Sequence, residues 1–113
     1  MRGLNASRAY QARSSDRHPR EQEADVFRRA TAALRLAQAG DEMARVRALA
    51  DNRLLWTTLS ILMADPANAL PPALRGSMIS IGGAIRRELD QPEPDLAFLI
   101  GINEQITAGL LGP

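Results

Sequence analysis

Few of the side chains that perform chemistry in proteins occur in this sequence of 113 residues. Cysteine is absent, which excludes disulfides and thiolate catalysis, and the single histidine is His18, next to Pro19. A lone histidine without neighbouring ligands is typical of an exposed loop, not of a metal site or a general base. No phosphate-binding glycine motif occurs. Two carboxylate pairs lie where helices are expected to begin, which the helix dipole explains: Glu21 with Glu23, and Glu93 with Asp95. We therefore expect no cofactor, no metal and no catalysis, and a protein that acts by binding a partner.

Three kinds of residue are candidates for binding. Trp56 is the only tryptophan and lies in the widest apolar run, where core packing is favoured over a role as binding anchor. Asn103 interrupts an apolar helical seam, so it either sets the helix register or recognises a partner, and the first use is commoner. The methionines Met43, Met63 and Met78 either line an adaptable groove or fill gaps in the core.

These residues fall on four predicted helices, which proline and glycine separate. The expected helices run from Pro19 to just before Gly40, from about Asp41 to Met63, from Pro71-Pro72 to Leu89, and from about Pro94 to Leu110. Apolar residues recur at spacings of three and four on each: Phe27, Ala30, Leu34 and Ala37; Met43, Val46, Ala50 and Leu54; Leu74, Met78, Ile81, Ile85 and Leu89; Leu96, Leu99, Asn103, Ile106 and Leu110.

Two of these helices carry unusual features. From Leu54 to Met63 the apolar pattern of the second helix widens, which indicates burial on more than one side or a partner-binding face. The third contains Gly76, Gly82 and Gly83, which indicate close approach of another helix, or local flexibility. Short connections between the helices predict an all-α, compact bundle of about four helices.

Composition and charge narrow the class of protein. About 45% of the residues are hydrophobic and 24% are charged, and the net charge is +1, which gives no general attraction to nucleic acid or an acidic membrane. Residues 1–18 form a basic leader, either a short helix or flexible, and residues 19–113 a single domain. No stretch reaches the roughly 20 apolar residues that span a bilayer, and no secretory signal is evident. We expect a cytoplasmic protein.

Several segments together resemble the bacterial flagellar biosynthesis regulator FlaF family. They are, in chain order, A-Y-Q at 9–11, P-R-E-Q-E-A at 19–24, A-D-N-R-L-L-W-T-T-L at 50–59, L-P-P-A-L-R-G-S-M-I-S-I at 70–81 and L-I-G-I-N-E-Q-I-T-A-G-L at 99–110. The resemblance implies a cytoplasmic, non-enzymatic protein that supports the synthesis and secretion of flagellin, acting on flagellin as a chaperone. It further implies opposition to a translational repressor called FlbT.

An apolar groove would suit that role, because flagellin termini are amphipathic helices that are buried only in the filament. A small bundle can accept such a helix along anchors at i, i+3/i+4 and i+7. We place the groove on the widest apolar surface, with one further residue from the third helix opposite: Leu55, Trp56, Leu59 and Met63, with Met78 or Ile85.

Two alternatives remain open. A direct regulator would bind flagellin mRNA through the leader arginines Arg8, Arg13 and Arg17, with a steep dependence on salt. The near-neutral net charge and the scarcity of aromatic residues count against it. An adaptor that binds another flagellar regulator, such as FlbT, would need the same kind of surface as a chaperone. The flagellin involved, the end of it that is bound and the oligomeric state are not specified by the sequence.

Overall fold

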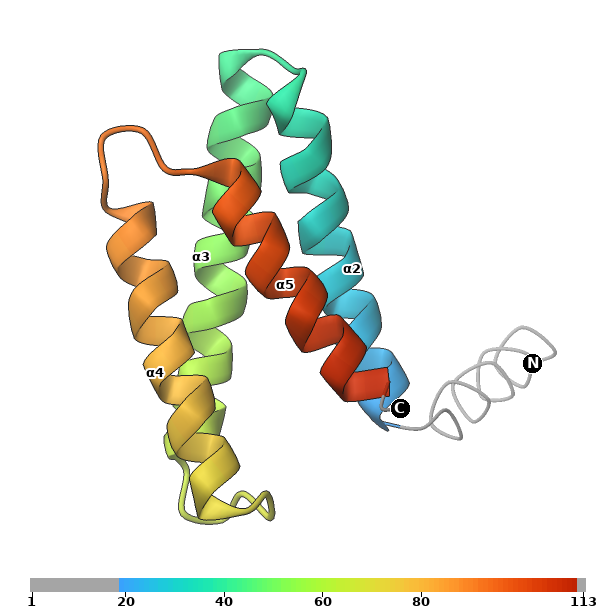
Figure 1. Cartoon of the computed structure of the whole chain (residues 1–113), viewed down its shortest axis with the longest axis vertical. Helices are drawn as coiled ribbons and strands as arrows, with labels where there is room; N and C mark the ends of the chain where they lie inside the picture. Colours follow the sequence, from blue (N-terminus) through green and yellow to red (C-terminus); the bar gives the residue numbers. More distant parts are fainter. Residues whose placement is uncertain (1–18, 112–113) are drawn as a thin grey trace, which may run out of the picture.

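Four α-helices, with no strand among them, make up residues 19–111, the part of the chain that the computed structural model describes (Figure 1). They are α2 (Pro19–Gln38), α3 (Glu42–Ala64), α4 (Pro72–Leu89) and α5 (Leu96–Leu111). The all-α fold with four helices, predicted from the sequence, is confirmed. The basic leader predicted for residues 1–18 lies outside the described residues.

The helix boundaries follow from local capping. The Asp41 side chain accepts a hydrogen bond of 2.8 Å from the backbone N–H of Ala44, so α3 begins at the next residue, Glu42. Pro72 occupies the first turn of α4, where a missing N–H costs nothing. Asp65 ends α3 in an extended conformation immediately before Pro66.

α5 begins at Leu96, two residues later than Pro94, near which the sequence predicts its start. Asp95 accepts from the N–H of Phe98 at 3.1 Å, and its own N–H donates to the Glu88 carboxylate at 3.0 Å. Arg45 of α3 donates to the carbonyl of Pro94 at 2.9 Å. These bonds hold the connection between α4 and α5 against the bundle, and α5 starts at Leu96 instead of Pro94.

The helices run alternately up and down, and each packs against a limited set of neighbours (Figure 1). α2 packs most extensively against α5, α3 packs against α2, and α4 packs against the other side of α3. α5 crosses the bundle obliquely, so its far end lies beside α2 and diverges from the far ends of α3 and α4 (Figure 1). As a result, α5 covers only part of the α3–α4 pair.

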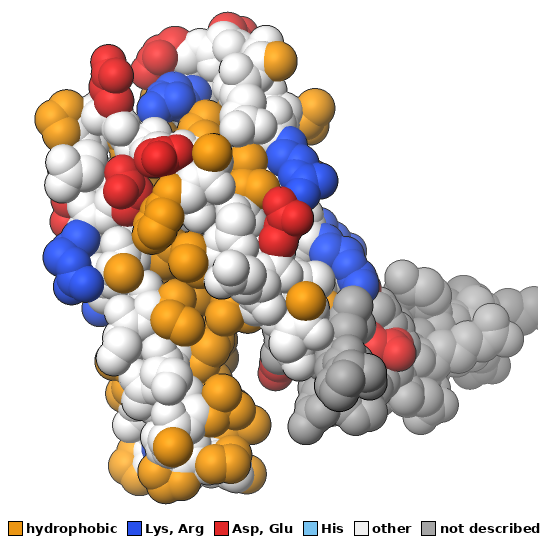
Figure 2. All heavy atoms as spheres, viewed as in Figure 1, with side chains coloured by type: hydrophobic (Ala, Val, Ile, Leu, Met, Phe, Trp, Pro, Cys, Tyr) orange, Lys and Arg blue, Asp and Glu red, His pale blue; other side chains and the backbone are white. Residues whose placement is uncertain are grey.

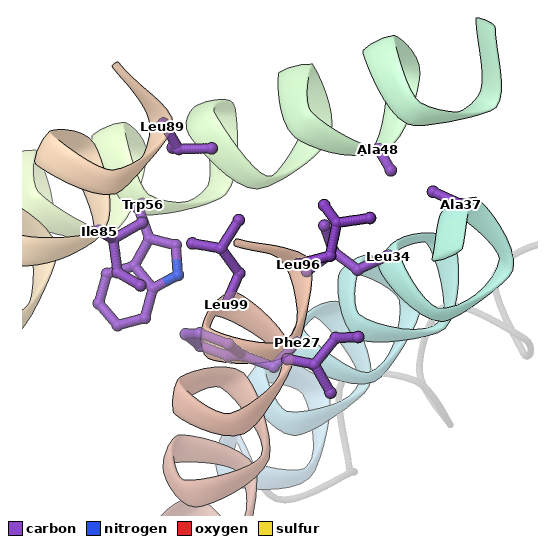
Figure 3. Close-up of a cluster of buried hydrophobic side chains, with 10 residues drawn as sticks. Phe27, Leu34, Ala37, Ala48, Trp56, Ile85, Leu89, Leu96 and Leu99 are labelled. Carbon is purple, nitrogen blue, oxygen red and sulfur yellow. The ribbon is translucent and has the colours of Figure 1, made fainter. Parts of the chain in front are cut away.

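A single apolar core joins all four helices. Phe27, Leu34 and Ala37 of α2 are buried in it, as the spacing of that helix predicts. Figure 3 shows Trp56 and Ile85 side by side at one end of this core and Ala37 with Ala48 at the other. Leu96 and Leu99 of α5 enter between them, as the predicted seam requires.

No helix in the described part of the chain combines the length and the apolarity that a bilayer crossing needs.

Candidate partner-binding surface

Trp56 belongs to a buried hydrogen-bond network that joins α3 to α5 through Asn103. Its indole Nε1 donates to Oδ1 of Asn103 at 3.0 Å, and Nδ2 of Asn103 donates to Oδ1 of Asn52 at 2.8 Å. All three side chains are fully buried. Trp56 also packs edge-on against Phe27, with ring centroids 5.6 Å apart. Asn103 therefore pairs with side chains of its own chain, as expected for a residue that sets helix register.

Asn52 is the member of this network that sequence reasoning missed. It precedes Trp56 by four residues, so the two share one face of α3. That spacing is visible in the sequence, but Asn52 stands between the charged Asp51 and Arg53, which favours an exposed position. Its Nδ2 and the Oγ of Ser60 are the buried side-chain polar atoms without a hydrogen-bond partner among the described residues.

Gly82 is where α4 comes closest to α3. A Cβ at this position would lie 2.7 Å from Oγ of Ser60 and 3.5 Å from Cε3 of Trp56, so only glycine fits without a shift. The close approach predicted from the glycines of this helix is confirmed at Gly82. No described residue of another helix lies within 4 Å of a Cβ at Gly76, and at Gly83 the neighbour is the Arg87 side chain of the same helix, so neither marks a close approach among the described residues.

From this contact toward the turn that joins α3 to α4, the apolar faces of these two helices extend beyond the part that α5 covers (Figure 1). On α4, Leu74, Met78 and Ile81 precede the buried Ile85 by 11, 7 and 4 residues and therefore share its face. Exposure increases along this line: Met78 and Ile81 are half-buried, and Leu74 is 47% exposed.

On α3 the apolar face also continues beyond Trp56, toward the turn that leads to α4. Leu59 and Met63 follow Trp56 by three and seven residues, and Leu55 precedes it directly. Leu55 and Leu59 are half-buried, packed against the edge of the core, and Met63 is buried. We call the following residues the cleft face: Leu55, Leu59, Met63, Leu74, Met78 and Ile81.

The surroundings of the cleft face are almost uncharged. Residues 54–81 contain only two charged side chains, Asp65 and Arg75. Both are used in the turn between the helices: Asp65 accepts from the N–H of Ala67, and Arg75 donates to the carbonyls of Leu70 and Asp65. Figure 2 shows hydrophobic side chains along one edge and at the foot of the lower half of α3 and α4, with most of the visible charged side chains higher up.

The residues predicted to bind a partner are thus only partly at the surface. Leu55, Leu59 and Met78 retain exposed area, and Met63 lies beside them. Trp56 and Ile85 are both 0% exposed and belong to the core. They support the cleft face from within, and their side chains offer no surface to a partner in this conformation.

A second apolar surface lies on the opposite side of α3. The four residues that trace the early face of this helix in the sequence are all exposed, and Ile61 extends the line. We call these residues the outer stripe: Met43 (59% exposed), Val46 (51%), Ala50, Leu54 (68%) and Ile61 (67%). The sequence offered burial on more than one side of α3 as one explanation of its broad apolar surface. In the structure this second side is exposed instead.

A shallow depression lies between α2 and α5. Arg28 and Arg35 line it with Glu104, and small residues form its floor. Arg28 pairs with Asp25 at 2.8 Å and Arg35 with Glu104 at 2.6 Å, so its charges are matched internally. Within residues 19–111 no group of three or more His, Cys, Asp or Glu side chains is placed to hold a metal ion.

Comparison with known proteins gives one clear match. The family described as "Flagellar protein FlaF" matches residues 6–110. No curated protein and no solved structure matches the chain significantly. Because the family match spans nearly the whole sequence, the chain belongs to the FlaF family of flagellar proteins.

Proposed function

We propose that this protein is a cytoplasmic flagellin-binding chaperone that supports flagellin synthesis and secretion during flagellum assembly. It acts by binding, without catalysis, and its partner surface is the cleft face. The single observation that carries the proposal is that the packed faces of α3 and α4 extend beyond α5, leaving apolar side chains half-covered at the edge of the core.

Such an edge suits an amphipathic helix. An incoming helix would cover the part of the cleft face that α5 does not reach and withdraw Leu74, Met78 and Leu59 further from water. Burying apolar surface contributes about 25 cal/mol per Å² of surface removed from water, so a helix of a few turns gains substantially here.

The scarcity of charge predicts the nature of the contact. Asp65 and Arg75, the only charged residues between positions 54 and 81, already bind backbone groups of the turn. Recognition at the cleft face therefore depends on apolar contact, and binding should be nearly insensitive to salt. An RNA partner held by leader arginines would instead lose affinity steeply as salt rises.

The test is a capture experiment with the full chain. Purified protein is mixed with flagellin of the same organism at low and high salt, with flagellin mRNA and an FlbT-type protein as parallel baits. We expect stoichiometric capture of flagellin that persists at high salt.

Variants then locate the surface. Leu74→Glu and Met78→Glu place a carboxylate on the cleft face and should abolish capture, whereas Leu54→Glu, a matched change on the opposite side of α3, should retain it. Circular dichroism establishes that each variant is folded. Salt-sensitive retention of mRNA without flagellin, capture of the FlbT-type protein alone, or equal loss in the Leu54→Glu control would overturn the proposal.

A further inference from the structure

The four helices form two pairs whose connections lie at the same end of the bundle. α2 packs most extensively against α5, and α4 packs chiefly against α3. We call these the α2–α5 pair and the α3–α4 pair. Because the helices run alternately up and down, the turn from α2 to α3 and the connection from α4 to α5 both lie at the upper end in Figure 1. The two pairs are therefore joined covalently at that end only.

The joined end is held together by noncovalent contacts as well. α2 packs against α3, and Ala37 and Ala48 lie at this end of their contact (Figure 3). Arg45 of α3 donates to the carbonyl of Pro94, in the connection from α4 to α5, at 2.9 Å. These contacts keep the two connections side by side, so a change in the angle between the pairs would turn about this end, as in a hinge.

Further from the joined end, the contact between the pairs has a polar centre. Asn103 of α5 accepts from Trp56 of α3 and donates to Asn52 of the same helix. Nδ2 of Asn52 is buried without a hydrogen-bond partner among the described residues. If the pairs separated here, water would replace both hydrogen bonds and also reach this unpaired donor. Separation therefore costs less free energy than it would at an apolar contact of the same size.

This polar centre covers two apolar side chains that continue the cleft face. Trp56 precedes Leu59 by three residues on α3, and Ile85 follows Ile81 by four residues on α4. Both Trp56 and Ile85 are 0% exposed, whereas Leu59 and Ile81 are half-buried. Movement of α5 away from α3 would therefore extend the cleft face by an indole ring and a branched aliphatic side chain.

We propose that the α2–α5 pair and the α3–α4 pair open about their joined end, and that Asn52, Trp56 and Asn103 form the latch that holds them closed. In the closed form, Trp56 and Ile85 belong to the core. In the open form they become part of the cleft face, and a partner helix contacts them. This use of the opening rests on the proposed flagellin-binding function, whereas the opening itself is a property of the free chain.

Hydrogen exchange of the Trp56 indole N–H tests the opening on the free chain. Trp56 is the only tryptophan, so NMR follows this proton without overlap from another indole. Its exchange is compared with that of the slowest backbone amides of α3, over a series of urea concentrations below the unfolding transition. Separation of intact helix pairs exposes the indole N–H but leaves the hydrogen bonds within the helices in place.

We expect the protection factor of the indole N–H to be at least about tenfold lower than that of those amides, because it is released without global unfolding. Its exchange should also depend less on urea, since opening exposes less surface than unfolding does. Equal protection and equal urea dependence would overturn the proposal, because the latch would then break only when the whole protein unfolds.

Two variants test whether the latch controls the opening. Asn52→Ala removes the acceptor of the Asn103 amide, between the two pairs, and should accelerate indole exchange about tenfold. Glu104→Gln removes the ion pair with Arg35, which lies within the α2–α5 pair, and should leave indole exchange unchanged. Equal acceleration by the two variants would contradict a latch between the pairs.

Flagellin then tests the use of the opening. Fluorotryptophan incorporated into this chain gives a single fluorine NMR resonance, because position 56 is its only tryptophan. Saturating unlabelled flagellin should shift that resonance. Capture of flagellin with no change in the resonance would show that the partner binds the closed form, and the proposal would be wrong. Absence of capture would instead count against the proposed flagellin-binding function, and hydrogen exchange of the free chain would still decide whether the pairs open.

Discussion

Trp56 and Asn103 are 47 residues apart in the chain, and the indole Nε1 of the first donates to Oδ1 of the second across 3.0 Å. This bond fixes how Asn103 is oriented, because an indole N–H can only donate. The amide nitrogen of Asn103 must then point at Asn52, which accepts at 2.8 Å. These three side chains thus hold α5 on α3. The cleft face, where flagellin is proposed to bind, lies next to this part of the core.

Removing the indole N–H should destabilise the fold. Trp56→Phe keeps an aromatic ring but leaves Oδ1 of Asn103 buried without a donor, and part of the indole volume empty. We expect a loss of about 2–4 kcal/mol in the free energy of unfolding. Urea denaturation followed by far-UV circular dichroism measures it, since the variant has no tryptophan fluorescence. Phe98→Leu, at a 39% exposed aromatic of α5, should cost less than about 0.5 kcal/mol.

Asn52 should be coupled to Trp56 through Asn103. Asn52→Ala leaves Nδ2 of Asn103 without its acceptor, at a cost of about 1–3 kcal/mol. In a double-mutant cycle with Trp56→Phe we expect a coupling energy of about 0.5–3 kcal/mol, because both residues bond to the same amide group. Additive effects would show that Asn103 does not transmit the interaction.

The glycines of α4 should respond in opposite directions. Gly82→Ala places a Cβ 2.7 Å from Oγ of Ser60 and should destabilise the protein by about 1–3 kcal/mol. Gly76→Ala meets nothing within 4 Å and should stabilise it by about 0.5–1 kcal/mol through helix propensity. Thermal unfolding of the two variants compares them directly.

Ser60→Ala should rescue the Gly82 variant. It removes the hydroxyl that the new Cβ would meet, and that hydroxyl has no hydrogen-bond partner among the described residues. The double variant Ser60→Ala/Gly82→Ala should therefore recover most of the lost stability. If the double variant remained as unstable as Gly82→Ala, contact with the Trp56 ring would be the dominant clash.

The cap of α3 gives a further prediction. Asp41→Ala removes the acceptor for the N–H of Ala44 and should cost about 0.5–2 kcal/mol. Asp51→Ala, an exposed aspartate in the middle of the same helix, is the matched control and should change stability by less than about 0.5 kcal/mol. Equal effects of the two variants would show that net charge, and not capping, determines the result.

The sequence by itself determined the four helices and most of their ends. Pro72, Asp41 and the Asp65-Pro66 pair act on backbone groups within a few residues, so their effects can be read without knowledge of the fold. The buried face of α2 could also be predicted, because its apolar residues Phe27, Leu34 and Ala37 recur on one side. On α5 the predicted seam of Leu96, Leu99 and Asn103 is buried, although apolar residues such as Phe98 also lie outside it.

Only the tertiary structure decided which side of α3 is buried. This helix has apolar residues on two sides. Their spacing fits a helical face in both cases and does not indicate which of the two is buried. The packing of α2, α4 and α5 covers the side of Trp56 and leaves that of Leu54 in water. The same is true of Gly82 and Gly76, whose roles differ because α3 passes close to one and not the other. Local sequence specifies a helix, whereas the side that it buries depends on neighbours that lie tens of residues away in the chain.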